Sequence, residues 1–358
     1  MDGTAIIFTH GLLHTLSAKT AHGLIRGSDR YDIRGVIDPL HAGRDAGEVF
    51  EQIHRGIPVF ADLSVCLAAL PQRPDFFIIG IASAGGRVLP EWLPLIREAL
   101  AAGLSVVNGL HDFLSDMPDL VALAQAQGCS LVDVRKPKPR AELHFWSGEI
   151  DRVGCPIVAV LGTDCAVGKR TTARILTLAC REAGLRAEMI YTGQTGWMQG
   201  WRYGFIFDST LNDFVSGELE HAIVRCWGEA RPDIIFIEGQ SALRNPSGPC
   251  GSEMLVSGRA DAAVLVHPPG RVFFKGWEDR QRRIPPLREE IALVRMYGCE
   301  TLGIALNTLG LTPPQVRAWQ RRYEEELGLP VVSPLDEGVA ALMPHIWGLI
   351  RTLHTDRP

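Results

Sequence analysis

The chain has 358 residues, of which 46% are hydrophobic and 22% are charged, and its formal net charge is −5. This length and composition are typical of a globular protein with two domains. Acidic and basic residues are mixed along the chain, so no basic block favours nucleic acid or an anionic membrane surface as a partner. The eight cysteines are scattered without a C-x-x-C pair, which predicts reduced thiols and argues against a zinc site.

The expected location is cytoplasmic. The N-terminal residues "MDGTAIIFTHG" have no basic segment and only a short apolar run, unlike a signal peptide. No apolar stretch reaches the roughly 20 residues that a membrane-spanning helix needs. The expected ligand is a small molecule, with neither nucleic acid nor a membrane as partner, and the apolar composition is compatible with a homo-oligomer.

Short apolar runs alternate with helical stretches through both halves of the chain. The predicted strands are residues 5–8, 33–38, 57–62, 76–82, 104–110 and 130–135, then 156–162, 186–193, 233–239, 262–267, 301–308 and 329–334. Apolar strands without polar alternation, separated by helices, indicate parallel sheets covered on both faces. The sequence therefore predicts an α/β fold with two doubly wound parallel-sheet domains, residues 1–145 and 150–358. Their join lies within residues 135–154, which are rich in proline and charge.

Polar residues follow several strands of the first domain. Asp38 ends the second strand, where dinucleotide-binding folds place a ribose-binding acid, but the first strand is not followed by a G-x-G-x-x-G loop. NAD(P) binding is therefore not favoured. Lys19 and Arg87 are candidate cations for a carboxylate, or else solvated surface charges. His111 follows the fifth strand and is a candidate general base, with a structural hydrogen bond as the alternative.

The second domain opens with a phosphate-binding loop. The stretch "GTDCAVGKRT", residues 162–171, follows an apolar strand and precedes a helical segment, as in a P-loop. Backbone N–H groups of such a turn surround a phosphate, and the helix N-terminus and the lysine ammonium favour its negative charge. The candidate cofactor-binding residues are Gly162, Thr163, Asp164, Gly168, Lys169, Arg170, Thr171, Thr172 and, in a later loop, Asn307.

The loop departs from the P-loop template in two ways. Five residues separate its glycines instead of the four of the template, and Arg170 stands where a hydroxyl would hold Mg²⁺. Thr171 lies one step further, rotated by about 100° around the helix. The loop thus suits binding of a diphosphate better than hydrolysis. If the ligand is ATP with Mg²⁺, Thr171 and Glu238 are the candidate metal ligands.

Polar residues also follow the other strands of the second domain, where open α/β sheets bind ligands. Glu238 ends a buried strand, a position suited to a metal ligand, a water-ordering group or a general base, and a capping role is its alternative. Asp213 is either a base or an N-cap. The candidate catalytic residues are Glu238, Asp213 and His111. The candidate substrate-binding residues are Thr192, Gly193, Gln194, Thr195, Gly239, Gln240 and Arg271.

Two resemblances add to these residues. "GTDCAVGKRT" resembles the P-loop of dethiobiotin synthetase, which shares the G-T-D-x-x-V-G-K start. A closer resemblance covers nearly the whole chain and is to the DgcN-type D-glutamate N-acetyltransferase family. The stretches that are similar to this family are "AKTAHGLIR", "GLHDFLSD", "GTDCAVGKRTTA", "TGQTGWM", "DFVSGELE", "IEGQSAL", "ALNT" and "PVVSPLDEG". This resemblance implies a Rossmann-like N-terminal domain, a P-loop NTPase-like C-terminal domain, and acetyl transfer from acetyl-CoA to D-glutamate.

Three functions remain open at this point. The first is an N-acyltransferase that moves an acetyl group from acetyl-CoA to the amine of an acidic amino acid, with the P-loop holding the diphosphate of the donor. The alternative is a kinase or ligase that uses ATP and Mg²⁺ to activate a carboxylate, as the dethiobiotin synthetase-like loop suggests. The third is a nucleotide-gated regulator of the MinD-like kind, with no chemistry of its own on a small substrate.

Overall fold

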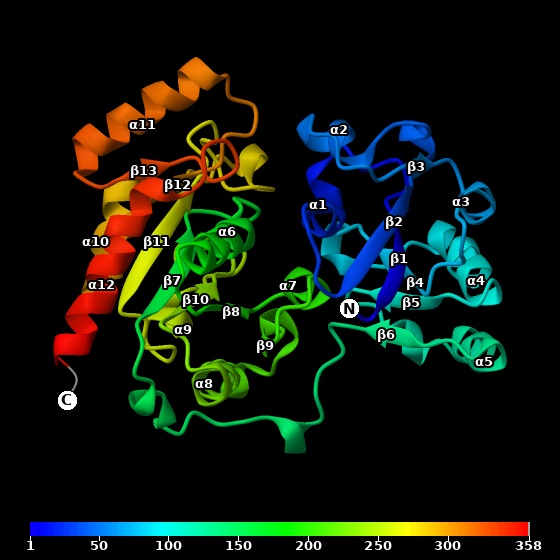
Figure 1. The fold of residues 1–358 in the computed structure, drawn as a ribbon, viewed down its shortest axis with the longest axis horizontal. Helices are drawn as coiled ribbons and strands as arrows, with labels where there is room; N and C mark the ends of the chain where they lie inside the picture. Colours follow the sequence, from blue (N-terminus) through cyan, green and yellow to red (C-terminus); the bar gives the residue numbers. More distant parts are fainter. Residues whose placement is uncertain (357–358) are drawn as a thin grey trace. The chain divides into compact units, whose positions relative to one another are not determined.

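The computed structural model describes residues 1–356, which form two compact units (Figure 1). The first unit consists of Met1–Pro137 and the short segment Gln194–Trp201. The second consists of Lys138–Gly193 and the chain from Arg202 onward. The predicted α/β fold with two parallel sheets is confirmed. The sequence predicted two continuous domains. It gave no sign that the segment Gln194–Trp201, from the second half of the chain, belongs to the first unit.

The first unit is built on a six-stranded sheet with the strand order β3-β2-β1-β4-β5-β6. Every pairing between these strands is parallel. The strands are β1 (Gly3–Phe8), β2 (Tyr31–Ile37), β3 (Val59–Phe60), β4 (Phe76–Ile79), β5 (Ser105–Asn108) and β6 (Leu131–Asp133). The helices are α1 (Lys19–Ile25), α2 (Ala46–Glu51), α3 (Leu63–Ala69), α4 (Leu93–Ala101), α5 (Pro118–Gln127) and α7 (Gln194–Met198).

Both faces of this sheet are buried. Along β1, Ile6 and Phe8 face one core, which includes Trp92, whereas Ala5 and Ile7 face a second core on the other side. Successive residues of a strand point to opposite faces. A strand covered on both sides must therefore be apolar at every position, and this is why the sequence shows a continuous apolar run there.

The second unit contains a seven-stranded sheet with the order β13-β12-β11-β7-β10-β8-β9, again with parallel pairings. The strands are β7 (Ile157–Gly162), β8 (Ala187–Tyr191), β9 (Tyr203–Gly204), β10 (Ile234–Glu238), β11 (Ala262–His267), β12 (Glu300–Leu306) and β13 (Val331–Val332). The helices are α6 (Lys169–Glu182), α8 (Asn212–Ala230), α9 (Ser252–Leu255), α10 (Leu287–Met296), α11 (Pro313–Leu327) and α12 (Met343–Asp356). Within the described residues, none of the helices combines the length and the apolar character needed to cross a membrane.

The α7 segment (Gln194–Trp201) completes the core of the first unit although it comes from the second half of the sequence. Met198 is fully buried within the core that contains Ile7. The side-chain amide of Gln199 donates to the backbone carbonyls of Gly23 and Gly27, at 2.8 and 2.9 Å. The first unit therefore lacks part of its core until this later segment of the chain is in place.

Substituting Met198 tests this dependence. Because a buried methionine loses both its transfer free energy and its packing when truncated, Met198→Ala should lower the free energy of unfolding by about 2–5 kcal/mol. Met296→Ala is the matched control, since Met296 is 84% exposed, and its effect should stay within about 0.5 kcal/mol. Urea unfolding followed by circular dichroism measures both. Equal effects of the two variants would contradict the core role of α7.

Candidate functional site

The predicted P-loop is confirmed as a strand, a turn and a helix at the centre of the second sheet. All six residues of β7 are buried, the strand ends at Gly162, and α6 begins at Lys169. β7 lies between β10 and β11, so the carboxyl ends of three neighbouring strands meet around this turn. In open α/β sheets this edge is where ligands bind.

The turn has the backbone conformation of an anion-binding loop. Ala166 and Gly168 have positive φ angles of 52° and 104°. Turns with such left-handed residues direct successive N–H groups into one concavity. A Cβ on Gly162 would lie 2.8 Å from Cγ2 of Val167, so a glycine is needed where the turn folds back over the strand end. The N-terminus of the 14-residue helix α6 adds a dipole that favours negative charge.

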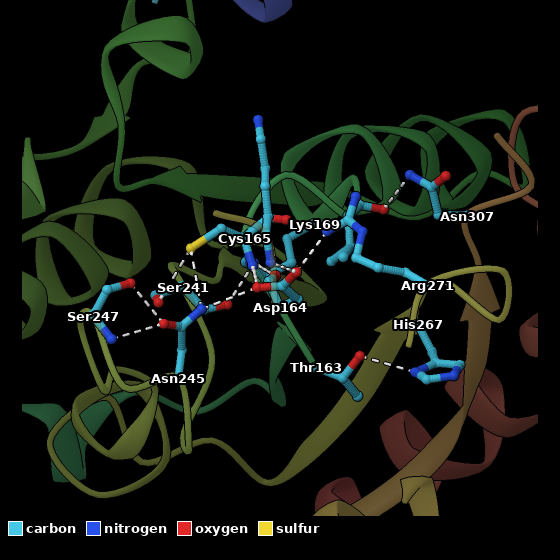
Figure 2. Close-up of polar contacts among 12 residues, drawn as sticks. Thr163, Asp164, Cys165, Lys169, Ser241, Asn245, Ser247, His267, Arg271 and Asn307 are labelled. Carbon is cyan, nitrogen blue, oxygen red and sulfur yellow. Dashed lines mark hydrogen bonds and ion pairs between the residues drawn. The ribbon is translucent and has the colours of Figure 1, made fainter. Parts of the chain in front are cut away.

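Asp164 lies at the centre of the polar contacts that hold this turn (Figure 2). Its carboxylate is fully buried and accepts hydrogen bonds at both oxygens. Oδ1 accepts from the side-chain amide of Asn245 at 2.9 Å and from the backbone N–H of Cys165 at 2.6 Å. Oδ2 accepts from Nη1 of Arg271 at 2.6 Å and from the backbone N–H of Lys275 at 2.8 Å. The carboxylate therefore ties the P-loop to two later loops of the same unit.

Lys169 and Asn307 also contact the backbone of the turn. The Lys169 ammonium donates to the carbonyl oxygens of Asp164 and Ser241, at 2.8 and 2.6 Å. The side-chain amide of Asn307 donates to the carbonyl of Val167 at 2.9 Å. Figure 2 shows these groups around the turn. The ammonium is thus held inside the loop that the sequence assigns to phosphate, where it can exchange a carbonyl partner for an anionic oxygen.

Thr163 rests on a neutral histidine. Its hydroxyl lies 2.9 Å from Nδ1 of His267, and the Tyr323 hydroxyl lies 3.2 Å from the other ring nitrogen, Nε2. Burial, with a smaller contribution from the nearby charge of Arg271, lowers the pKa of His267 to about 4. The ring is therefore uncharged at neutral pH, and it supports the loop through the Thr163 hydroxyl.

Glu238 is the buried acid beside the loop. It is the last residue of β10 and pairs with Val160 of β7, two residues before Gly162. Burial raises the pKa of its carboxyl to about 7, although the charges of Arg170 and Lys169 and the N–H of Thr192 lower it. The backbone N–H of Thr192 donates to Oε2 at 3.1 Å. The group therefore exchanges a proton near neutral pH, as a general acid or base must.

The predicted substrate residues divide into two sets. Thr192 lies against Glu238: its hydroxyl donates to the Glu238 carbonyl at 2.6 Å and accepts from the Gln240 side chain at 2.9 Å. Gly193 follows it, and Gly239 passes so close to β7 that a Cβ would lie 2.3 Å from the carbonyl oxygen of Val160. These four residues, Thr192, Gly193, Gly239 and Gln240, surround Glu238.

The remaining candidates lie elsewhere. Gln194 and Thr195 belong to α7 in the first unit, where the Thr195 hydroxyl lies 3.3 Å from that of Thr20. Asp213 is exposed in the first turn of α8. His111 is exposed in the first unit, and its backbone N–H donates to the Gly86 carbonyl at 2.7 Å. Their catalytic and substrate-binding roles stay predictions.

The predicted metal ligands are Thr171 and Glu238, at the start of α6 and the end of β10. Among the side chains that the structure describes, no group of three or more His, Cys, Asp and Glu residues is arranged to hold a metal ion. Thr171 and Thr172 lie in the first turn of α6, where Thr172 is buried and Thr171 partly so. A cation at Glu238 would have to displace a proton from a carboxyl whose pKa is about 7. Magnesium binding by Thr171 and Glu238 stays a prediction.

Several residues that shape the site were not among the sequence candidates. Asn245, Ser241 and Lys275 contact the P-loop from positions 72–111 residues later in the chain. The stretch "SALRNPSGPCGSE" is rich in glycine and proline, and Asn245 within it is fully buried and donates to Asp164. Arg271, predicted to bind substrate, forms an ion pair with Asp164. In the sequence, the one sign that the loop has such partners is Asp164 itself, an acidic residue within a P-loop.

Comparisons with known proteins agree with this architecture. A family model described as the P-loop domain of a domain of unknown function, DUF1611, matches residues 144–343. A second, described as the Rossmann-like domain of the same family, matches residues 39–137. A crystal structure of a DUF1611 family protein from Anabaena variabilis ATCC 29413 is similar, with a TM-score of 0.87 and 31% identity, over 97% of this chain and 99% of that chain.

Two relatives of this chain are named for an enzymatic activity. The D-glutamate N-acetyltransferase of Tritonibacter scottomollicae is 33% identical over 273 residues, which are 74% of this chain and 79% of that protein. A D-glutamate N-acetyltransferase of a Pseudoalteromonas species is 31% identical over 291 residues, which are 79% of this chain and 84% of that protein. These matches confirm the resemblance inferred from the sequence motifs.

The Asp164 contacts lead to a stability prediction. Asp164→Ala leaves Arg271 and the N–H of Lys275 without their buried acceptor, so we expect the free energy of unfolding to fall by about 3–5 kcal/mol. The control is Asp119→Ala, which removes an exposed ion pair with Arg97 and should cost less than about 1 kcal/mol. Denaturant unfolding measures both. A cost for Asp164→Ala no larger than that of the control would show that the carboxylate does not hold the loop.

Proposed function

This chain belongs to the DUF1611 family, and from that premise we propose that it is an N-acetyltransferase that moves the acetyl group of acetyl-CoA to the amine of D-glutamate or a similar acidic amino acid. The names of the two curated relatives support this reaction. The structural observation that carries it is Glu238, a buried carboxyl with a pKa of about 7 beside the P-loop. Such a group accepts a proton from an ammonium at neutral pH.

The P-loop takes the diphosphate of the donor in this proposal. The N–H groups of the turn and of the start of α6 surround the phosphate oxygens, and Lys169 supplies a positive charge. Lys169 already lies within the turn, bonded to two carbonyl oxygens. Arg170 takes the place of the hydroxyl that would hold Mg²⁺. This substitution suits a diphosphate that is bound but not cleaved.

The transfer step uses Glu238 as the base. The carboxylate takes a proton from the acceptor ammonium, and the lone pair of the free amine attacks the thioester carbonyl carbon. A carbon–nitrogen bond forms while the carbonyl electrons move to oxygen, where N–H donors stabilise the negative charge. The tetrahedral intermediate then collapses, the carbon–sulfur bond breaks, and the CoA thiolate leaves. The nitrogen loses its second proton as the thiolate gains one, which gives the amide and free CoA.

The acceptor is expected next to Glu238. Thr192, Gly193, Gly239 and Gln240 border the carboxyl, and these residues offer hydroxyl, backbone and amide groups for a polar amino acid. Thr192 and Gln240 are already bonded to each other, so their orientation is fixed before a substrate arrives. Preorganised groups of this kind reduce the entropy lost on binding.

The competing proposal is a kinase or ligase that uses ATP with Mg²⁺. The Gly-Lys sequence of the loop and Thr171 in the first turn of α6 favour it. In that case Lys169 would bind the β- and γ-phosphates, and Thr171 with Glu238 would hold the metal. The two proposals differ in a simple requirement, since acetyl transfer from acetyl-CoA consumes no nucleotide.

The first test is release of the CoA thiol. Acetyl-CoA with D-glutamate should yield free thiol and N-acetyl-D-glutamate without ATP or Mg²⁺, measured with a thiol reagent and by mass spectrometry. Lys169→Ala should raise the KM for acetyl-CoA about 10–100-fold, because a charge-assisted contact to phosphate is lost. Lys136→Ala, on an exposed lysine paired with Asp116, should leave KM unchanged. A strict ATP requirement would rule out the acyltransferase.

The second test is the pH dependence of kcat/KM. A base must be deprotonated to act, so activity should rise tenfold per pH unit below about pH 7, the pKa of Glu238, and then level off. Glu238→Gln should lose about 10²–10⁴-fold in kcat and the inflection near pH 7. Asp213→Asn is the comparison. If that variant, and not Glu238→Gln, removes the inflection, then Asp213 is the base.

A further inference from the structure

A basic hairpin lies next to the P-loop and has no role in the reaction as described. We define it as residues 271–284, between β11 and α10. Phe273 and Arg283 pair as an antiparallel bridge, and the N–H of Phe274 donates to the carbonyl of Arg282 at 2.8 Å. The N–H of Ile284 donates to the carbonyl of Val272 at 3.0 Å. The segment is therefore an ordered hairpin.

The hairpin is fixed to the P-loop at one arm. Nη1 of Arg271 lies 2.6 Å from Oδ2 of Asp164 and 2.9 Å from the carbonyl oxygen of Cys165. The backbone N–H of Lys275 donates to the same Oδ2 at 2.8 Å. Phe274, between these two anchors, is 4% exposed. The Asp164 carboxylate thus holds the hairpin against the P-loop, the proposed binding site of the diphosphate.

The hairpin concentrates positive charge. It contains Arg271, Lys275, Arg280, Arg282 and Arg283 against only Glu278 and Asp279, a net charge of +3 in a chain whose net charge is −5. Lys275 and the last three arginines are exposed. With the carboxylates whose side chains the structure describes, Arg280, Arg282 and Arg283 form no ion pair.

Aromatic rings in the hairpin orient two of these cations. The guanidinium of Arg283 lies 5.4 Å from the ring centre of Phe273, and that of Arg280 lies 5.7 Å from that of Trp277. A cation over an aromatic face keeps its N–H groups available for an anion. A planar guanidinium is suited to bidentate contacts with phosphate. The hairpin therefore has the chemistry of a second phosphate site beside the first.

We propose that Lys275 and Arg283 bind the phosphomonoester on the ribose of the CoA thioester, so that this hairpin selects CoA over nucleotides that have only a diphosphate. The inference rests on the proposed function, in which CoA occupies the P-loop. A phosphomonoester carries a charge of about −1.5 to −2 at neutral pH. CoA has this group in addition to its diphosphate, whereas ADP and dephospho-CoA lack it. A cationic arm fixed beside a diphosphate-binding loop can therefore distinguish the two classes.

The test compares CoA with dephospho-CoA by isothermal titration calorimetry at constant ionic strength. The native protein should bind CoA at least about tenfold more tightly, the effect of one good charge-assisted contact. Lys275→Gln/Arg283→Gln should lose this preference while its Kd for dephospho-CoA stays within about twofold. Lys275→Gln should reduce the preference without disturbing the Asp164 contact, because only the backbone of Lys275 makes that contact.

The control variant removes the same charge elsewhere. Arg152 and Arg295 are exposed, and they precede β7 and β12 at the amino edge of the sheet. Arg152→Gln/Arg295→Gln should keep the preference for CoA, which excludes a general effect of net charge. Circular dichroism and the midpoint of thermal unfolding verify that each variant is folded.

Three results would overturn the inference. Equal affinity of the native protein for CoA and dephospho-CoA would refute the hairpin site while leaving the acyltransferase intact. A hairpin variant that raises the KM for D-glutamate, with its preference for CoA unchanged, would place the acceptor there instead. A native protein that binds neither compound but binds ATP would refute the proposed function itself, and the hairpin site with it.

Discussion

The site depends on one buried carboxylate. Asp164 accepts four hydrogen bonds from three segments that lie far apart in the sequence, and one of the donors is the guanidinium of Arg271. A buried charge is stable only when such partners surround it, because its desolvation alone costs several kcal/mol. Loss of one of these partners would leave the carboxylate less well compensated. The shape of the phosphate turn, and the hairpin beside it, follow from this single requirement.

Glu238 shows the opposite balance on the neighbouring strand. Its carboxyl is also buried, but the N–H groups and cations around it do not fully offset the loss of water, and its pKa rises to about 7. Asp164 forms an ion pair with Arg271, in which Nη1 lies 2.6 Å from Oδ2. Thr192, by contrast, gives Glu238 one uncharged donor, its backbone N–H, at 3.1 Å from Oε2. Asp164 thus supports the loop through its hydrogen bonds and its ion pair, whereas Glu238 can exchange a proton in the physiological range.

The sequence predicts the scaffold well because its signals are local. A parallel strand buried on both faces must be apolar throughout, so β7 and β10 can be recognised as apolar runs, and the Gly-Lys turn between β7 and α6 identifies the P-loop. The contacts that hold the turn are not local. Asn245 reaches Asp164 across 81 residues, and nothing in the stretch around Asn245 distinguishes a buried support from a substrate loop. The two-residue strand β9 was not predicted either, although β3 and β13, which are equally short, lie within predicted apolar runs.

The least predictable feature is the path of the chain after β8. Thr192 and Gly193 belong to the second unit and border Glu238, while Gln194, the next residue, begins the helix that completes the core of the first unit. No change in composition marks this crossing, because the residues on both sides are small and polar. The connection is covalent and contains no spacer. The boundary between the two units therefore falls at a single peptide bond, between Gly193 and Gln194.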